Sequence, residues 1–305
     1  MIRRLSDQIK NNFAKPFIFE WFLHTYLKDI IMKNTIAVLA VSSFLAFSAC
    51  KKGENTTSPD KTETSQPEKF TVDSVKVGDS SKIADSLTIG FTSKLLVFPT
   101  LKDKQLLDSI YFQNKGIKDF TKKGLQAFLD SEKIKYFNSV KSDSKDWLSD
   151  ISYAQNWYTN THMNLVSNDN DYMHIEYVWS SYEGGAHDNY GFSERVFDLK
   201  NNKKLELKDI TSMPKARLES ILMKNINTIH NGARGNGDDV KNSDMLLVEV
   251  IPATDNFYFD QKNLYFHYSP YEITAFAAGD IVIPVSWEEL KGTLNAEFKE
   301  RMKIK

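Results

Sequence analysis

Histidines, carboxylates and a single cysteine are the side chains best suited to chemistry in this 305-residue sequence. His187 is the most suggestive of them, because it follows two adjacent glycines in the run that begins at Tyr182. A metal site needs three or four converging ligands, and the remaining histidines are scattered singly along the chain, at His24, His162, His174, His230 and His267. We therefore predict no metal, catalytic or cofactor-binding residues, and we expect the His187 imidazole to bind nearby backbone.

Other chemical motifs are equally weak. The sequence has no nucleophile elbow, phosphate loop or dinucleotide fingerprint, so it predicts no cofactor. Asp238 and Asp239 lie in a glycine-rich segment but lack the alternating ligands of a calcium loop. His174 and Glu176 project from one face of a predicted strand, and we expect that face to meet solvent. Paired carboxylates cannot be recognised in sequence, so a hydrolase with such a site stays open as an alternative.

Aromatic residues form 12% of the chain and gather around the glycine pair and around Ser269-Pro270. Tyrosine rings can present rigid, amphipathic surface to a protein or a glycan, although aromatics also simply suit a half-buried sheet. The predicted ligand-binding residues are Tyr182, His187, Tyr190, Tyr268 and Tyr271. Gly184 and Gly185 are predicted to be structural, because glycine permits positive φ or a close backbone approach.

The only cysteine, Cys50, follows a basic start at Met32-Lys33-Asn34, an apolar run over residues 35–47 and the small residues Ser48-Ala49. This pattern resembles a bacterial lipoprotein signal, and the apolar run is too short to span a membrane comfortably. We expect residues 32–50 to be the signal peptide, with Cys50 as the lipidated N-terminus.

The regions on either side of this cysteine follow from that interpretation. Residues 1–31 are interpreted as an over-long upstream translation, and the polar residues 51–76 as a flexible linker. The domain would then lie outside the cytoplasm, tethered to a bacterial membrane, with the outer membrane favoured. The formal net charge of −1 offers no basic field for nucleic acid.

Hydrophobic periodicity predicts an α+β fold, with helices packed on an antiparallel sheet and a smaller N-terminal α/β subdomain (77–170) before a larger domain (171–305). Helices are expected around residues 106–116, 120–137 and 214–229, and a final helix after a capping box of Ser286 and Glu289. Strands are expected around residues 87–98, 151–166, 173–179, 192–199, 246–251, 257–259, 264–268 and 281–285, with a turn at residues 260–263. Asn201-Asn202 suits a hairpin turn.

The region from Tyr172 to Leu294 resembles a known extracellular domain. The order Tyr-x-Gly-Gly-Ala-His, Asn-Phe-Tyr-Phe-Asp (256–260), Leu-Tyr-Phe-His-Tyr (264–268) and Ile-Pro-Val (283–285) is similar to the domain shared by the lysozyme-binding anti-sigma factor RsiV and the N-terminal region of the peptidoglycan deacetylase PdaC. The resemblance implies an α+β, RsiV-like domain and a lysozyme-type protein or peptidoglycan as partner. The sequence has neither the sigma-binding segment nor the deacetylase domain, so those activities are not implied. We expect a membrane-anchored, non-catalytic binding module, with an envelope hydrolase as the alternative.

Overall fold

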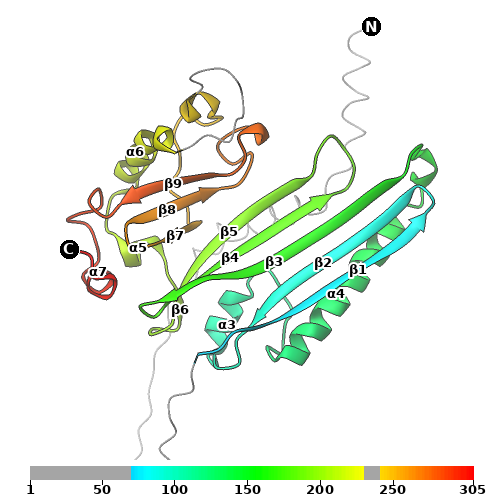
Figure 1. Ribbon diagram of the computed structural model, residues 1–305, viewed down its shortest axis with the longest axis horizontal. Coiled ribbons are helices and arrows are strands. Elements are labelled where there is room, and N and C mark those ends of the chain that lie inside the picture. The colour runs from blue at the N-terminus through cyan, green and yellow to red at the C-terminus, as the bar shows by residue number, and fades with distance from the viewer. Residues whose placement is uncertain (1–69, 230–240) are drawn as a thin grey trace, which may run out of the picture. The chain divides into compact units, whose positions relative to one another are not determined.

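The computed structural model describes residues 70–229 and 241–305, and a six-stranded sheet is its largest element (Figure 1). Its strands follow one another in chain order: β1 (Asp73–Ala84), β2 (Leu87–Val97), β3 (Gln155–Asp169), β4 (Tyr172–Tyr182), β5 (Asn189–Asp198) and β6 (Lys203–Lys204). Neighbouring strands are antiparallel except β2 and β3, which pair in parallel. The α+β prediction is confirmed. The parallel pair departs from the expected antiparallel sheet because two helices carry the chain back to the end where β2 began.

Those two helices cover one face of the large sheet. Both α3 (Lys104–Ile110) and α4 (Lys122–Asp143) begin with a side-chain cap, from Asp103 and Thr121 respectively. Side chains alternate across a strand, so the face toward the helices receives the predicted apolar row of β4. This core joins the buried residues Met173, Ile175 and Tyr177 to Phe91 of β2, Leu107 of α3 and Leu125 of α4.

A second, three-stranded sheet forms the other core. It contains β7 (Phe257–Phe259), β8 (Asn263–Tyr268) and β9 (Ile281–Ser286), all antiparallel. It packs with α5 (Leu207–Ile210), α6 (Lys215–Asn225) and α7 (Ala296–Met302). Short 3-10 turns complete the described chain at Leu148–Asp150, Ile226–Thr228, Asn242–Met245 and Phe276–Ala278.

Asn256 joins the small sheet to the open edge of β5. Its side-chain oxygen accepts from the Glu194 backbone N–H, and its amide nitrogen donates to the carbonyls of Phe192 (3.2 Å) and His267 (2.7 Å). Ser269 Oγ accepts from the Phe192 N–H at 2.9 Å. Side chains from the small sheet therefore satisfy edge groups that another strand would otherwise bind.

Several predicted boundaries differ from the structure. The hairpin of β3 and β4 carries the large sheet across the division expected between residues 170 and 171. Strand β1 begins at Asp73, inside the predicted linker. The apolar run 246–251 forms only an isolated bridge between Leu246 and Thr274, so the strand predicted there is wrong.

The final helix also begins later than predicted. The reciprocal bonds expected of the capping box do form, because Glu289 Oε2 accepts from the Ser286 N–H and Ser286 Oγ accepts from the Glu289 N–H. Only turns follow them, and Gly292 adopts a φ of 83°. The helix α7 starts after Asn295, whose side chain caps it.

Four predictions fall wholly or partly outside the described residues: the interpretation of residues 1–31, the signal with Cys50, the linker up to residue 69, and the interpretation of Asp238 and Asp239. None of the helices described in residues 70–229 and 241–305 is long and apolar enough to cross a membrane.

Candidate functional site

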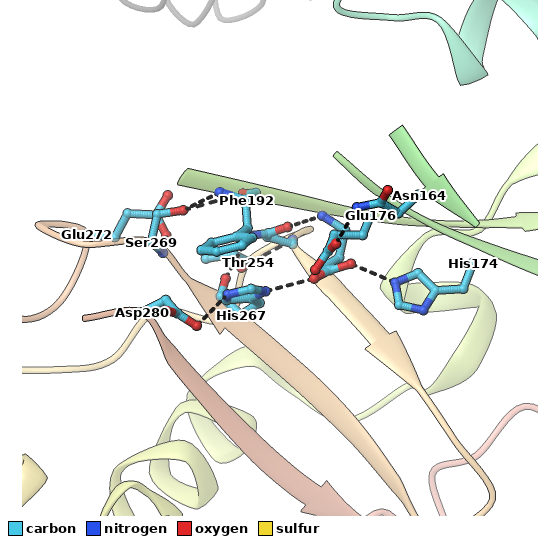
Figure 2. A network of polar contacts seen from close by, with 11 residues as sticks. Asn164, His174, Glu176, Phe192, Thr254, His267, Ser269, Glu272 and Asp280 are labelled. Atoms are coloured by element: carbon cyan, nitrogen blue, oxygen red, sulfur yellow. Dashed lines mark hydrogen bonds and ion pairs between the residues drawn. The ribbon is translucent and has the colours of Figure 1, made fainter. Parts of the chain in front are cut away.

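A chain of two imidazoles and two carboxylates lies where the small sheet meets the large one. Glu194 of β5 accepts two hydrogen bonds, one at Oε2 from His174 Nε2 of β4 (2.6 Å) and one at Oε1 from His267 Nδ1 of β8 (2.8 Å). The other nitrogen of His267 lies 3.2 Å from Asp280 Oδ2. Figure 2 shows His174, His267 and Asp280 along this line of hydrogen bonds. We call these four residues the carboxylate–imidazole chain.

His267 carries a proton on both ring nitrogens, because each nitrogen faces a carboxylate oxygen that can only accept. Burial opposes its charge, but the hydrogen bonds to Asp280 and Glu194 raise the pKa of His267 to about 9. Burial likewise opposes ionisation of Glu194, but the bonds from His174 and His267 hold the pKa of Glu194 below its usual value. Glu194 and His267 therefore form a buried ion pair where the two sheets meet.

Aromatic rings enclose the two imidazoles. Tyr258 stacks on His174 with centroids 4.8 Å apart, and Phe192 stacks on His267 at 4.6 Å. His174, Glu194 and His267 are each 4% exposed, whereas the Asp280 side chain is 37% exposed. The expectation that the His174 face of β4 meets solvent is wrong at His174, because the small sheet covers it.

A second cluster of side chains lies on the surface next to this chain and contains three of the five predicted ligand-binding residues. The His187 ring stacks on Phe276 at 3.9 Å and lies 6.4 Å from the Tyr271 ring. Tyr190 meets Phe276 edge to face at 5.6 Å. We call His187, Tyr190, Tyr271 and Phe276 the aromatic patch. Phe192 connects it to the carboxylate–imidazole chain, because the Phe192 ring also meets Tyr190, at 5.9 Å.

Tyr271 has an unusual backbone for a bulky residue. Its φ is 70°, and its side chain is 57% exposed. Left-handed backbone costs a tyrosine free energy and persists where surrounding structure enforces it, often at functional sites. Here the strained residue presents its ring to solvent beside His187, whose Nε2 lies 3.4 Å from the Tyr271 hydroxyl.

The glycine pair shapes the turn that brings His187 to the patch. Gly184 and Gly185 have φ values of 89° and 108°, in the region that only glycine adopts readily. A Cβ on Gly184 would lie 3.6 Å from the Trp157 ring, whereas nothing lies within 4 Å of one on Gly185. His187 Nδ1 donates to the Asp188 carbonyl at 2.7 Å.

The other two predicted tyrosines lie elsewhere. The Tyr182 hydroxyl donates to the Gly185 carbonyl at 3.1 Å and so braces the turn. Tyr268 is 1% exposed in the core of the small sheet and donates to the Pro252 carbonyl. Tyr268 is therefore wrong as a surface ligand-binding residue. Tyr268 lies on the same face of β8 as the buried Leu264 and Phe266, so strand alternation places its ring in the core.

Two pockets in the described chain are small and open to solvent. They measure about 130 and 230 Å³, and His174 lines the smaller one together with Tyr172, Asp169 and Asp260. Pockets that enclose a drug-sized ligand are about 300–1,000 Å³. Within the described ranges no three His, Cys, Asp or Glu side chains are arranged to hold a metal ion. Neither of these two pockets is large enough to enclose a drug-sized ligand.

A comparison with protein-family models found a match to part of this chain. Residues 208–288 match the family model described as "Protein of unknown function (DUF3298)". The match covers α5, α6 and the small sheet, including His267 and Asp280, but not His174 or Glu194.

Two solved structures are similar to this chain. A DUF3298-family protein from Bacteroides fragilis NCTC 9343 is 20% identical, with a TM-score of 0.63 over 78% of this chain and 98% of its own. A DUF3298-family protein from Pseudomonas aeruginosa PAO1 is 12% identical, with a TM-score of 0.46 over 75% of this chain and 96% of its own. The search of curated proteins found no match. The B. fragilis likeness shows that this chain shares its fold with a DUF3298-family protein.

Proposed function

We propose that this protein is a binding module of the bacterial cell envelope, held at a membrane by lipid on Cys50, whose aromatic patch engages a lysozyme-type protein or a wall glycan. The observation that carries this proposal is the patch itself. Rigid aromatic rings contribute contact area at low entropic cost and are enriched where proteins bind partners. The strained backbone of Tyr271 holds one such ring toward solvent.

The resemblance to the RsiV and PdaC domain supports an envelope ligand, because the quoted motifs include His187 and parts of all three strands of the small sheet. The aromatic patch offers such a ligand an exposed surface, on which Tyr271 is 57% exposed. Binding on such a surface depends on a few buried aromatic anchors rather than on total contact area.

Binding to a basic lysozyme and to purified wall glycan, measured by calorimetry at physiological salt, tests the proposal. Tyr271→Gly and Phe276→Ala should each weaken binding at least about tenfold, the size expected for a contact at the centre of an interface. Tyr153→Ala is the matched control, because Tyr153 is 66% exposed and makes none of the patch's ring contacts. Equal binding by all variants would contradict the proposal.

The lipid anchor has its own test. In a bacterial host, Cys50→Ser should move the protein from the membrane fraction to the soluble fraction, since two acyl chains anchor stably and their loss leaves only the protein's own affinity. Alanine at Ser48 keeps a small residue before the cysteine and should leave the protein membrane-bound. A Cys50→Ser protein that stays in the membrane fraction would refute the anchor.

The alternative function, an envelope hydrolase, has one supporting observation: Glu194, His174, His267 and Asp280 are the kind of groups that move protons. Both Glu194 oxygens and both His267 nitrogens already form hydrogen bonds within the carboxylate–imidazole chain. His174, Glu194 and His267 are also deeply buried. The two sheets would have to separate before a substrate could come within hydrogen-bond distance of these groups. Release of reducing ends from peptidoglycan, lost in a folded Glu194→Gln variant, would favour the hydrolase over the binding module.

A further inference from the structure

The large sheet has a second face that the small sheet covers only in part. Val75 and Phe91 pack into the core on the side of α3 and α4, so the alternate residues of β1 and β2 point the other way. The small sheet contacts the large sheet through β5 and reaches His174 through Tyr258. In the described chain, the rest of this surface on β1 to β4 is half-buried or exposed. We call it the open face.

Three basic side chains stand in one row across the open face. Lys76 of β1 lies opposite Lys94 of β2, and Lys94 lies opposite His162 of β3. Burial lowers the pKa of His162, and the charges of Lys76 and Lys94 lower it further. The His162 imidazole therefore interacts electrostatically with both lysines. No carboxylate in the described chain forms an ion pair with either lysine. We call this the cationic row.

The cationic row is a local feature and not part of a general basic field, because the chain has a net charge of −1. An acidic group on the same face, Glu176, accepts from Asn164 Nδ2 at 3.0 Å. Asn164 in turn accepts from Lys94 at 3.5 Å. Glu176 lies on β4, three strand spacings or about 14 Å from β1. An acidic ligand group near Lys76 would therefore avoid it.

A row of hydroxyl and amide groups runs beside the cationic row toward the aromatic patch. In register across the sheet it contains Thr92, Asn160, Ser180 and Tyr190. Asn160 Nδ2 donates to Ser180 Oγ at 3.3 Å, which leaves further donor and acceptor capacity on the amide. The distance from β1 to Tyr190 on β5 is four strand spacings, about 19 Å, which suits an oligomeric ligand rather than a single sugar.

We propose that the open face and the aromatic patch together bind an acidic glycan strand, whose carboxylates lie on the cationic row and whose sugar rings stack on the patch. Amide and hydroxyl side chains between the two match sugar hydroxyls, and aromatic rings match the apolar faces of sugars. A lysozyme-type basic protein fits this face poorly, since like charges across an interface oppose binding. The proposal rests on the proposed binding function and specifies its ligand class.

The experiment compares three polymers against the full chain at physiological salt by calorimetry: polygalacturonate as the acidic glycan, dextran as the neutral glycan and polyglutamate as the acidic non-sugar. Polygalacturonate should bind, dextran much more weakly. Lys76→Gln with Lys94→Gln should weaken polygalacturonate at least about tenfold, because hydrogen bonds to charged groups are the strong ones. Lys122→Gln with Lys133→Gln removes the same charge from α4, where those lysines pair with Asp73 and Asp79, and should change little.

The readouts separate failure of the inference from failure of the proposed function. The inference would be overturned if the two double variants weakened binding equally. It would also be overturned if polyglutamate bound as tightly as polygalacturonate, because binding would then depend on charge alone. Lysozyme binding that depends on Tyr271 but not on the lysines would also overturn it and would leave the binding module intact. As a further check, bound polygalacturonate should raise the NMR-measured pKa of His162, since an added anion favours the charged imidazole. An unchanged pKa would contradict the placement on the cationic row.

Discussion

Glu194 and His267 form a buried ion pair in which Glu194 Oε1 accepts from His267 Nδ1 at 2.8 Å, although the two residues are 73 positions apart in sequence. The pair joins β5 of the large sheet to β8 of the small one. Because Asp280 holds the opposite nitrogen of the same imidazole, His267 stays protonated well above the pH at which an exposed histidine loses its charge. The two sheets are therefore joined by a group whose charge depends on pH.

Stability should fall as pH rises through this titration. The pKa of His267 is raised from 6.5 to about 9 in the folded protein, so its contribution is complete below pH 6.5 and disappears as pH passes about 9. The rise corresponds to about 3 kcal/mol in the free energy of unfolding at about 1.4 kcal/mol per unit. Urea unfolding at pH 6, 7.5 and 9.5 measures it. The fall should be much smaller in His267→Gln, and an equal fall in both proteins would assign the effect to other groups.

The acid side has the opposite sign. The pKa of Glu194 is lowered by its two imidazole partners, so its contribution is present above the usual carboxyl pKa and is lost as pH falls through the lower folded value. Glu194→Gln should destabilise the fold by about 3–5 kcal/mol at pH 6, because it leaves a buried His267 charge without one of its partners. Asp280→Asn should cost less, since the Asp280 side chain is 37% exposed. A smaller loss from Glu194→Gln than from Asp280→Asn would contradict this ranking.

Local patterns made much of the fold predictable. The alternation of Met173, Ile175 and Tyr177 marks a strand with one buried face, and all three lie in the core. Asn202, at the predicted hairpin turn, adopts a φ of 50°. By contrast, the meeting of Glu194 with His174 and His267 is a property of the tertiary fold. Histidines that stand singly in the sequence therefore converged without any local signal.

Predictions failed where a local signal lacked tertiary support. Ser286 and Glu289 make the bonds of a capping box, but Leu290 and Gly292 turn the chain instead of continuing a helix. The run from Leu246 is apolar enough for a strand, yet Leu247 is 63% exposed and pairs through its N–H with the Ile273 carbonyl alone. Strands need a partner along their length, and sequence does not show whether one is present.

Asn256 should matter more to stability than its partial exposure suggests. Asn256→Ala removes two hydrogen bonds to the open edge of β5 and one to the His267 carbonyl of β8, and it leaves the Glu194 N–H without its acceptor. An unpaired buried backbone group costs about 1–3 kcal/mol, so we expect a loss of roughly that size in urea unfolding. Asn256→Asp keeps the acceptor and loses both donated bonds, and it should fall between wild type and Asn256→Ala. A loss no larger than that of Asn263→Ala, at the start of β8, would contradict this role of Asn256 between the two sheets.

The glycine pair gives a prediction about backbone strain. Gly184→Val and Gly185→Val should each lower stability by about 1–3 kcal/mol, because both positions have positive φ and a β-branched residue is strained there. The Gly184 change should cost more, since a Cβ there also meets the Trp157 ring at 3.6 Å. Gly78→Val is the control: it lies in β1, where a Cβ meets only Thr92 Oγ1 at 3.8 Å, and β-branched residues suit strands. Thermal melts that rank Gly78→Val with the other two would refute the strain argument.

Tyr268 and Tyr271 look alike in sequence, three residues apart, and the structure separates them completely. Tyr268 is 1% exposed and Tyr271 is 57% exposed with a φ of 70°. Tyr268→Ala should cost about 3–5 kcal/mol by emptying a core position, and any binding it loses should follow unfolding. Tyr271→Gly should leave stability equal or higher, because glycine relieves the left-handed backbone, and yet should abolish binding to the ligand of the patch. Melts and calorimetry on both variants measure the two effects, with Tyr271→Asn as the control that tolerates the same φ without an aromatic ring. If Tyr271→Gly binds as tightly as wild type, the strained tyrosine has no part in recognition and the aromatic patch loses its central residue.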